Sequence, residues 1–266
     1  MYNPDRKDNL LDIYTAPDSK ATLFYVHGGG YVLDDKSNRE DYLYRFVSEG
    51  YNVVNVNYEL SPDMRYPGGL EQVNNALAYV FDNADEYGID PNKIFLSGDS
   101  AGGHATAQLS ALLTNPDYAS EFDFKPANIN NDMKPLGYIA VGALFDPATG
   151  DDTGFFLTDW LFGACFRSYF DVVNIEDSSD VSQASMYENI NKDFPPTFSS
   201  DGNFGSFTSQ AIEFNKRLVD MGVEAELLLF DRSESTLIHV FELNVEDHFA
   251  NQVHQAQLSF MENRIG

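Results

Sequence analysis

The sequence predicts an α/β fold in which a mostly parallel central sheet carries helices on both faces. Short apolar runs, such as residues 51–58, are nearly continuous, which is typical of strands buried on both faces. These runs alternate with segments of helical pattern, and this order favours parallel strands joined by right-handed crossovers. A length of 266 residues fits one such domain, residues 1–266, that contains an insertion.

Seven apolar runs are expected to form the strands of this sheet. The second run leads straight into His27, and the fourth leads into a glycine-rich turn around Ser100. Each run is short and bounded by polar or turn-forming residues, as strands are. The expected strands are residues 10–14, 21–26, 51–58, 93–97, 137–145, 197–200 and 224–230.

Five helices are expected between and after these strands, and proline and glycine mark several of their ends. Pro67 lies near the first turn of the second helix and Gly88 follows its last turn. Gly50 and Gly222 end two others. The expected helices are residues 38–49, residues 67–87, the segment that follows Ser100, residues 206–221 and residues 245–264.

Residues 147–193 interrupt the alternation of strands and helices. The segment is rich in aromatic residues, including Phe155, Phe156, Trp160 and Phe162, and it is too long for a simple loop. Two interpretations fit it. It forms a cap or lid over the active site, or it is an ordinary helix docked on the edge of the sheet.

Charge and composition exclude several classes of partner. The formal net charge is −26, which argues against binding of nucleic acid and of anionic membrane surfaces. No segment reaches the length of about 18 apolar residues that a membrane span needs. Cys165 is the single cysteine, so no internal disulfide can form. Residues 1–6 contain no apolar signal core, and a cytoplasmic location is therefore expected.

Two glycine-rich motifs predict nucleophilic catalysis. Gly98 and Gly102 flank Ser100 in the pattern of a nucleophile elbow, a strand-to-helix turn that exposes a serine hydroxyl. Upstream, residues 27–30 read His-Gly-Gly-Gly, the pattern of an oxyanion-hole loop. A serine hydroxyl also needs a base to take its proton and donors that stabilise the oxyanion. We expect the donors to be the backbone amides of Gly28, Gly29 and Ala101.

The base must be one of five histidines. His27 is expected to brace the oxyanion loop, and His104, one turn into the helix after Ser100, is expected to be structural. His248 and His254 lie in the last helix and are expected on the surface. His239 follows the seventh strand, where the chain order of nucleophile, acid and base places the histidine, so it is the predicted general base.

These motifs resemble those of acetyl esterases and lipases of the α/β-hydrolase superfamily, in the hormone-sensitive-lipase-like carboxylesterase group. The resemblance runs from about residue 10 to the last helix. It implies an α/β-hydrolase fold, a Ser/Asp/His triad, no cofactor and activity on short acyl esters. Some members of the group remove acetyl or feruloyl groups from carbohydrates. The segments that carry the resemblance are 27–31, 58–62, 66–67, 90–94, 98–104, 195–197 and 239–241.

The acid of the triad is where the sequence departs from this pattern. The resemblance places the acid a few residues after Pro-Pro-Thr, and that position here is Gly205. The nearest acid is Asp201, at the carboxyl end of the sixth strand, where catalytic groups of open α/β sheets gather. Asp201 is therefore the predicted catalytic acid, although an Asp-Gly pair is also a common turn signal. Asp231 and Glu234 are weaker alternatives.

A second departure is Asp34, which stands where the group often has glycine. Together with Asp35 it places two acids beside the oxyanion loop. This pair disfavours negatively charged substrates, or it is simply a solvated turn.

Two classes of function fit these residues. The favoured one is a serine carboxylesterase that acts on a small-molecule ester, with an acylated carbohydrate as one candidate substrate. The alternative, motivated by Gly205, is a small-molecule binding protein with little or no catalysis; a peptidase is a weaker third. No metal-ligand spacing and no dinucleotide motif is present, so neither a metal nor another cofactor is expected. A homo-oligomer is left open.

Overall fold

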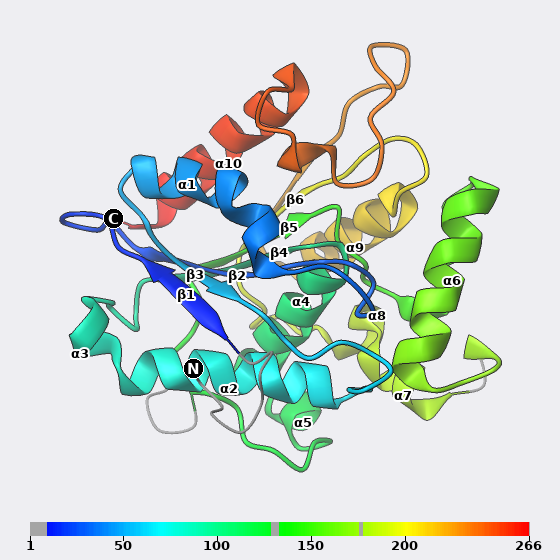
Figure 1. Ribbon diagram of the computed structural model, residues 1–266, viewed down its shortest axis with the longest axis horizontal. Helices are drawn as coiled ribbons and strands as arrows, with labels where there is room; N and C mark the ends of the chain where they lie inside the picture. Colours follow the sequence, from blue (N-terminus) through cyan, green and yellow to red (C-terminus); the bar gives the residue numbers. More distant parts are fainter. Residues whose placement is uncertain (1–9, 129–132, 176–177, 266) are drawn as a thin grey trace.

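A seven-stranded, mostly parallel sheet forms the centre of the computed structural model, which describes residues 10–128, 133–175 and 178–265 (Figure 1). The strand order is β1-β3-β2-β4-β5-β6-β7, with β1 antiparallel to β3 and all other neighbours parallel. The predicted fold class is confirmed. The strands are β1 (Leu11–Tyr14), β2 (Thr22–Val26), β3 (Asn52–Val56), β4 (Ile94–Asp99), β5 (Gly137–Val141), β6 (Thr197–Ser200) and β7 (Ala225–Leu228).

The helices follow the predicted order, with one expected helix divided in two. The segment 67–87 breaks at Asn83, whose side-chain amide donates to the carbonyl of Tyr79 at 2.7 Å. The main helices of the described residues are α1 (Glu40–Ser48), α2 (Gly68–Asp82), α3 (Ala84–Tyr87), α4 (Ser100–Thr114), α5 (Pro116–Ala119), α9 (Thr208–Asp220) and α10 (His248–Ile265). Short 3-10 helices are η1 (Lys36–Arg39), η2 (Pro147–Thr149) and η4 (Phe241–Leu243).

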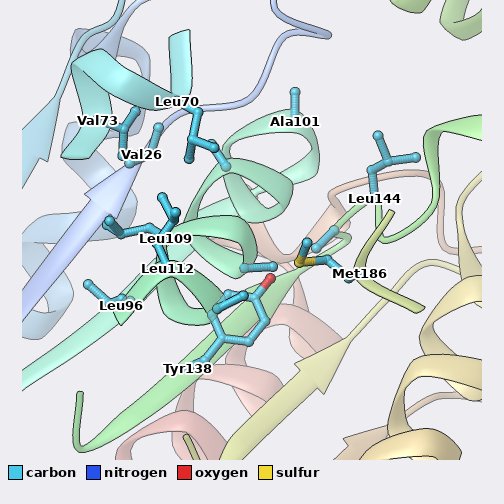
Figure 2. Packing of buried hydrophobic residues seen from close by; sticks show 14 of the residues in the cluster. Val26, Leu70, Val73, Leu96, Ala101, Leu109, Leu112, Tyr138, Leu144 and Met186 are labelled. Atoms are coloured by element: carbon cyan, nitrogen blue, oxygen red, sulfur yellow. The ribbon is translucent and has the colours of Figure 1, made fainter. Parts of the chain in front are cut away.

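Apolar side chains bury both faces of the sheet. On one face α2, α4 and α9 pack on the strands, and Figure 2 shows Leu70, Leu96 and Leu109 meeting in this layer. On the other face α1 and α10 cover the sheet with residues such as Phe46 and Phe260 (Figure 1). Burial of strands on both faces explains why their sequences read as continuous apolar runs.

The carboxyl ends of the parallel strands bring the predicted site residues to one edge of the sheet. Val26 pairs with Gly98, so His27 and Asp99 leave neighbouring strands side by side. Val141 pairs with Ser200, which places Asp201 at the same edge. Ligands of open α/β sheets bind at this edge, so the topology alone assembles the candidate site.

Besides η2, the segment 147–193 contains three α-helices among its described residues: α6 (Phe156–Phe170), α7 (Ser179–Ala184) and α8 (Met186–Asn189). In Figure 1, α6 stands apart from the helices that cover the sheet. The ring of Tyr169 in α6 stacks on the ring of Tyr31, which directly follows the oxyanion loop, with centroids 3.8 Å apart. The segment therefore contacts the candidate site, and its role as a cap stays a prediction.

Within the part of the chain that the structure describes, no helix is long and apolar enough to cross a bilayer. Residues 1–6, on which the predicted location partly rests, lie outside the described residues.

Candidate active site

Ser100 occupies a strained turn between β4 and α4. Its φ is +51°, in the left-handed region that residues with a side chain rarely adopt. A Cβ at Gly98 would lie 2.5 Å from the carbonyl carbon of Gly102, and one at Gly102 would collide with the carbonyl oxygen of Val26. The turn is therefore possible only because both positions are glycine. This is the geometry that the elbow motif predicts.

His239 reaches Ser100 directly. Its Nε2 lies 2.9 Å from the Ser100 hydroxyl oxygen. Asn203, just after β6, fixes the chain two residues before His239. Its backbone amide donates to the carbonyl of Leu237 at 2.8 Å, and its side-chain oxygen accepts from the Leu237 amide at 2.9 Å. Val240 has a φ of +53°, which a β-branched residue adopts only when its surroundings enforce it.

Two aromatic rings enclose the imidazole. Phe162 of α6 and Phe207, which precedes α9, each meet the His239 ring edge-on at 5.0 Å between centroids. Burial among these rings lowers the pKa of His239 from 6.5 to about 4, although the charge of Asp99 acts in the opposite direction. The imidazole is therefore uncharged at neutral pH, as a general base must be.

The other nitrogen of His239 meets a hydroxyl. Nδ1 lies 2.7 Å from the Oγ of Ser206, and that hydroxyl also donates a short hydrogen bond to Oδ1 of Asp201. Asp201 thus lies one residue beyond His239, with Ser206 between them. The assignment of Asp201 as catalytic acid stays a prediction. Sequence reasoning missed Ser206, although it directly follows the glycine at the expected acid position.

Gly205 itself faces the segment 147–193. Its φ is +59°, and a Cβ built there would lie 3.2 Å from Thr158 Oγ1 and 3.4 Å from the Phe155 ring. The two weaker acid candidates, Asp231 and Glu234, are exposed on the loop that follows β7. Ser206 therefore occupies the place beside His239 that an acid would take in a conventional triad.

Asp201 shares its buried surroundings with a second carboxyl group. Asp201 is 1% exposed and Glu242 is fully buried, and Glu242 accepts a 2.8 Å hydrogen bond from Ser200. Burial and the negative charge of Glu242 raise the pKa of Asp201, against the lowering effect of the hydrogen bonds from Ser206 and Gly202. Burial likewise raises the pKa of Glu242 to about 7. The pair is costly to hold with two negative charges.

The oxyanion loop lies directly against the elbow. A Cβ at Gly28 would approach Asp99 Oδ2 to 2.5 Å and the Cβ of Ser100 to 3.0 Å, so this position admits no side chain. Nδ1 of His27 donates to the carbonyl of Gly28 at 2.8 Å, and the His27 ring stacks on Tyr58. Tyr58 donates to the same carbonyl at 3.1 Å. His27 thus braces the loop, as expected from the sequence.

A buried arginine joins the oxyanion loop to the elbow. Arg39 donates to both carboxylate oxygens of Asp99 at 2.8 Å and to Asp34 at 2.7 Å. Although burial raises it, the pKa of Asp34 is lowered overall by the hydrogen bond from Asn38 and by the charge of Arg39. Asp34 is therefore an ion-pair partner of Arg39, which neither sequence interpretation of this residue anticipated.

Two of the three remaining histidines are buried and one is exposed. His104 is buried, accepts from the Tyr31 hydroxyl at Nδ1 and donates from Nε2 to the carbonyl of Ala184, both at 2.7 Å. His248 is exposed, as predicted. The prediction for His254 was wrong: it is 3% exposed, because its ring packs edge-on against Phe46 of α1.

Comparison with known protein families identifies the family of this chain. The family model BD-FAE matches residues 11–147, slightly more than half of the chain. The chain belongs to the BD-FAE family. The matched region holds the oxyanion loop and the elbow, and His239 lies beyond it.

Curated relatives cover a shorter stretch. An acetyl esterase of Salmonella paratyphi B is 40% identical over 88 residues, which is 32% of this chain and 27% of that protein. The acetyl esterase of Salmonella dublin matches equally. The match spans little more than a quarter of the length of these relatives.

Solved structures extend the likeness over the whole fold. Esterase B from Lactobacillus rhamnosis has a TM-score of 0.85 at 19% identity, covering 98% of this chain and 84% of that one. A bacterial heroin esterase scores 0.76 at 19% identity, covering 98% and 86%. An esterase of the bacterial hormone-sensitive lipase family scores 0.74 at 21% identity, again covering 98% and 86%. The chain therefore has an α/β-hydrolase fold, which includes the residues 11–147 that the family model matches. The predicted resemblance to α/β-hydrolase esterases is confirmed.

Proposed function

We propose that this protein is a serine carboxylesterase that hydrolyses short-chain, acetyl-type esters through an acyl-enzyme intermediate. The observation that carries the proposal is the 2.9 Å contact between Ser100 Oγ and His239 Nε2, made at a strained elbow beside a glycine loop. A nucleophile within hydrogen-bond reach of an uncharged base is the arrangement that acyl transfer requires. The acetyl esterases among the relatives support this substrate class.

Acylation begins when His239 Nε2 takes the proton of Ser100 and the serine oxygen bonds to the ester carbonyl carbon. The carbonyl oxygen becomes negative and is stabilised by the backbone amides of Gly28, Gly29 and Ala101. Ala101 lies in the first turn of α4, where amides have no partner within the helix and the helix dipole favours negative charge. The tetrahedral intermediate then breaks its bond to the alcohol oxygen, which leaves with the proton from His239.

Deacylation repeats the same steps with water. His239 takes a proton from the water molecule, whose oxygen bonds to the acyl carbon. The intermediate collapses, the bond to Ser100 breaks, and the serine oxygen regains the proton from His239. None of these reaction steps needs a cofactor. Asp201 completes the proposed triad by supporting the positive charge that His239 carries in each transition state.

We also propose that residues 147–193 form a cap over this site. The ring contact between Phe162 of α6 and His239 supports this role, as does the stacking of Tyr169 on Tyr31. The exposed aromatic and aliphatic side chains of α6 would then lie near the entrance for substrate. An acylated carbohydrate is one substrate that such aromatic surfaces accept.

The test is hydrolysis of 4-nitrophenyl acetate and butyrate by the wild type, Ser100→Ala and His239→Ala. We expect both variants to lose nearly all activity, because nucleophile and base act as one unit. Ser110→Ala, which removes another buried serine hydroxyl of α4, is the matched control and should keep full activity. Full activity in folded Ser100→Ala would disprove the mechanism.

A second candidate function is a small-molecule binding protein with little catalysis. The observation in its favour is that His239 Nδ1 meets the hydroxyl of Ser206 and not a carboxylate. Its signature would be a folded wild type that hydrolyses neither ester faster than Ser100→Ala while still binding such molecules. Retention of the elbow, base and glycine loop favours the esterase.

A further inference from the structure

The contacts of Ser206 suggest a role that the triad leaves unassigned. Ser206 is 4% exposed, and its hydroxyl oxygen lies between two functional groups. On one side it is 2.7 Å from His239 Nδ1, and on the other it donates to Asp201 Oδ1. Ser100, His239, Ser206 and Asp201 thus form one continuous chain of hydrogen bonds.

The single proton of Ser206 gives this chain a direction. Asp201 Oδ1 also accepts the amide of Gly202 at 2.8 Å, so this oxygen is an acceptor and takes the hydrogen bond of Ser206 as well. Ser206 then has no proton left for His239, and Nδ1 can bond to it only by donating. Nδ1 therefore carries the imidazole proton, and Nε2 presents its lone pair to Ser100.

The reverse direction would disable the base. If Ser206 donated to Nδ1, the imidazole proton would move to Nε2, and His239 could not accept a proton from Ser100. An acid that contacts histidine directly prevents this in a conventional triad, and its loss costs about 10⁴ in rate through the wrong tautomer. Here no carboxylate is recorded against His239 among the described residues, so the tautomer must be fixed through Ser206.

We propose that Ser206 is a positioning residue that transmits the acceptor character of Asp201 to His239, replacing the direct acid contact of a conventional triad. The proposal rests on the proposed esterase function. It assigns Asp201 an indirect role, and it explains how a chain with glycine at position 205 retains an oriented base.

The first test is a double-mutant cycle on 4-nitrophenyl acetate with Ser206→Ala, Asp201→Ala, which removes the acceptor oxygen, and the double variant. Because the two residues act in series, each single variant should lose on the order of 10²-fold or more in kcat, with KM little changed. The double variant should lose no more than the worse single variant. Losses that multiply in the double variant would overturn the relay.

Ser199→Ala is the matched control for this cycle. Ser199 is a fully buried serine of β6, and its hydroxyl has no hydrogen-bond partner among the described residues. Its removal should leave kcat unchanged. Circular dichroism and the unfolding midpoint establish that each variant is folded.

The second test reads the tautomer without activity, through the ¹⁵N chemical shifts of the His239 ring at pH 7. The wild type should show a protonated Nδ1 and an unprotonated Nε2. Ser206→Ala and Asp201→Ala should lose this preference. A wild type with the proton on Nε2, or a folded variant that keeps the wild-type tautomer, would refute the proposal.

These outcomes separate the relay from the esterase. If the wild type hydrolyses esters and Ser100→Ala does not, the proposed function stands even when Ser206→Ala is as active as the wild type; the relay is then wrong. If the wild type hydrolyses no ester, the proposed function fails, and the tautomer measurement still decides whether Ser206 orients His239.

Discussion

At the scale of single residues, the enclosure of His239 by two phenyl rings sets its protonation state. Phe162 and Phe207 exclude water from the imidazole, and desolvation disfavours the charged form. The pKa is thereby lowered to about 4. A base with so low a pKa remains available in mildly acidic solution, so the acidic limb of kcat/KM should lie well below pH 6.5.

Phe162→Ala should move that limb toward higher pH. Removing the ring admits water to the imidazole, so the pKa of His239 rises toward its ordinary value of 6.5. More of the enzyme is then protonated at pH 5 to 6, and hydrolysis in this range should fall relative to that at pH 7.5. The measurement is kcat/KM for 4-nitrophenyl acetate from pH 4.5 to 8.

Phe166→Ala provides the comparison for this variant. Phe166 lies one turn further along α6 and is 2% exposed, so its truncation also opens a cavity. Both variants should lose stability, on the order of 3–5 kcal/mol for a buried phenylalanine. Only Phe162→Ala should shift the pH profile. Equal shifts in both would show that loosening of α6, and not solvation of His239, is responsible.

The residues of the site differ in how far the sequence could predict them. Ser100 and His239 could be chosen because a local motif and the chain order each constrain their position. Ser206 could not be chosen, because its proposed role depends on contacts with Asp201 and His239, and neither residue is adjacent to it in the sequence. His254 was expected on the surface, because the weakly amphipathic sequence of α10 does not show which side chains are buried. Its burial arises from packing of α10 against α1.

At the scale of elements, Arg39 holds η1 and the oxyanion loop against the end of β4. Arg39 is 7% exposed, and its guanidinium lies between Asp99, next to Ser100, and Asp34, which follows the oxyanion loop. Its planar fork suits bidentate pairing with a carboxylate. The two motifs that we propose to supply the nucleophile and the oxyanion donors are thus linked by one buried ion-pair network.

Arg39→Met should destabilise the protein and slow catalysis together. Among the side chains that the structure describes, the substitution leaves Asp99 with the 2.8 Å hydrogen bond from Tyr25 alone. Leaving a buried charge without its ion-pair partner costs about 3–5 kcal/mol. It also frees the glycine loop, so oxyanion stabilisation and kcat should fall. Denaturant unfolding and kcat for 4-nitrophenyl acetate measure the two effects.

Lys216→Met controls for the lost positive charge. Lys216 pairs with Asp220 on the exposed face of α9, so the substitution changes the net charge equally without stranding a buried group. Its stability and kcat should match the wild type. If Arg39→Met matched Lys216→Met in stability and kcat, the ion pairs of Arg39 would contribute to neither stability nor catalysis.

Elements were more predictable than their ends. Strand and helix order followed from the alternation of apolar runs and helical patterns, because a buried parallel sheet imposes that pattern. The division of residues 67–87 at Asn83 was not foreseen, since a side-chain bond to Tyr79 interrupts an otherwise helical sequence. The fifth strand ended early, at Val141, because Gly142 turns the chain with a φ of +51°.

At the scale of the whole molecule, the formal net charge of −26 is the dominant feature. The chain has 42 acidic and 16 basic side chains, so most carboxylates have no basic partner of their own. Mutual repulsion among them destabilises a compact state. Near the oxyanion loop, Arg39 pairs with both Asp34 and Asp99 and so offsets part of this negative charge.

Added salt should therefore stabilise the fold at neutral pH. Raising NaCl from 0.01 M to 1 M shortens the screening length from about 30 Å to about 3 Å, which removes most of the repulsion between surface charges. Each kcal/mol gained should raise the unfolding midpoint by about 2–4 °C for a chain of this size. The discriminating condition is a pH near the isoelectric value of about 4.2, where the net charge is close to zero and the salt response should disappear. An equal rise in midpoint at both pH values would show that salt acts through exclusion from the protein surface, and the charge of the molecule would then have little part in its stability.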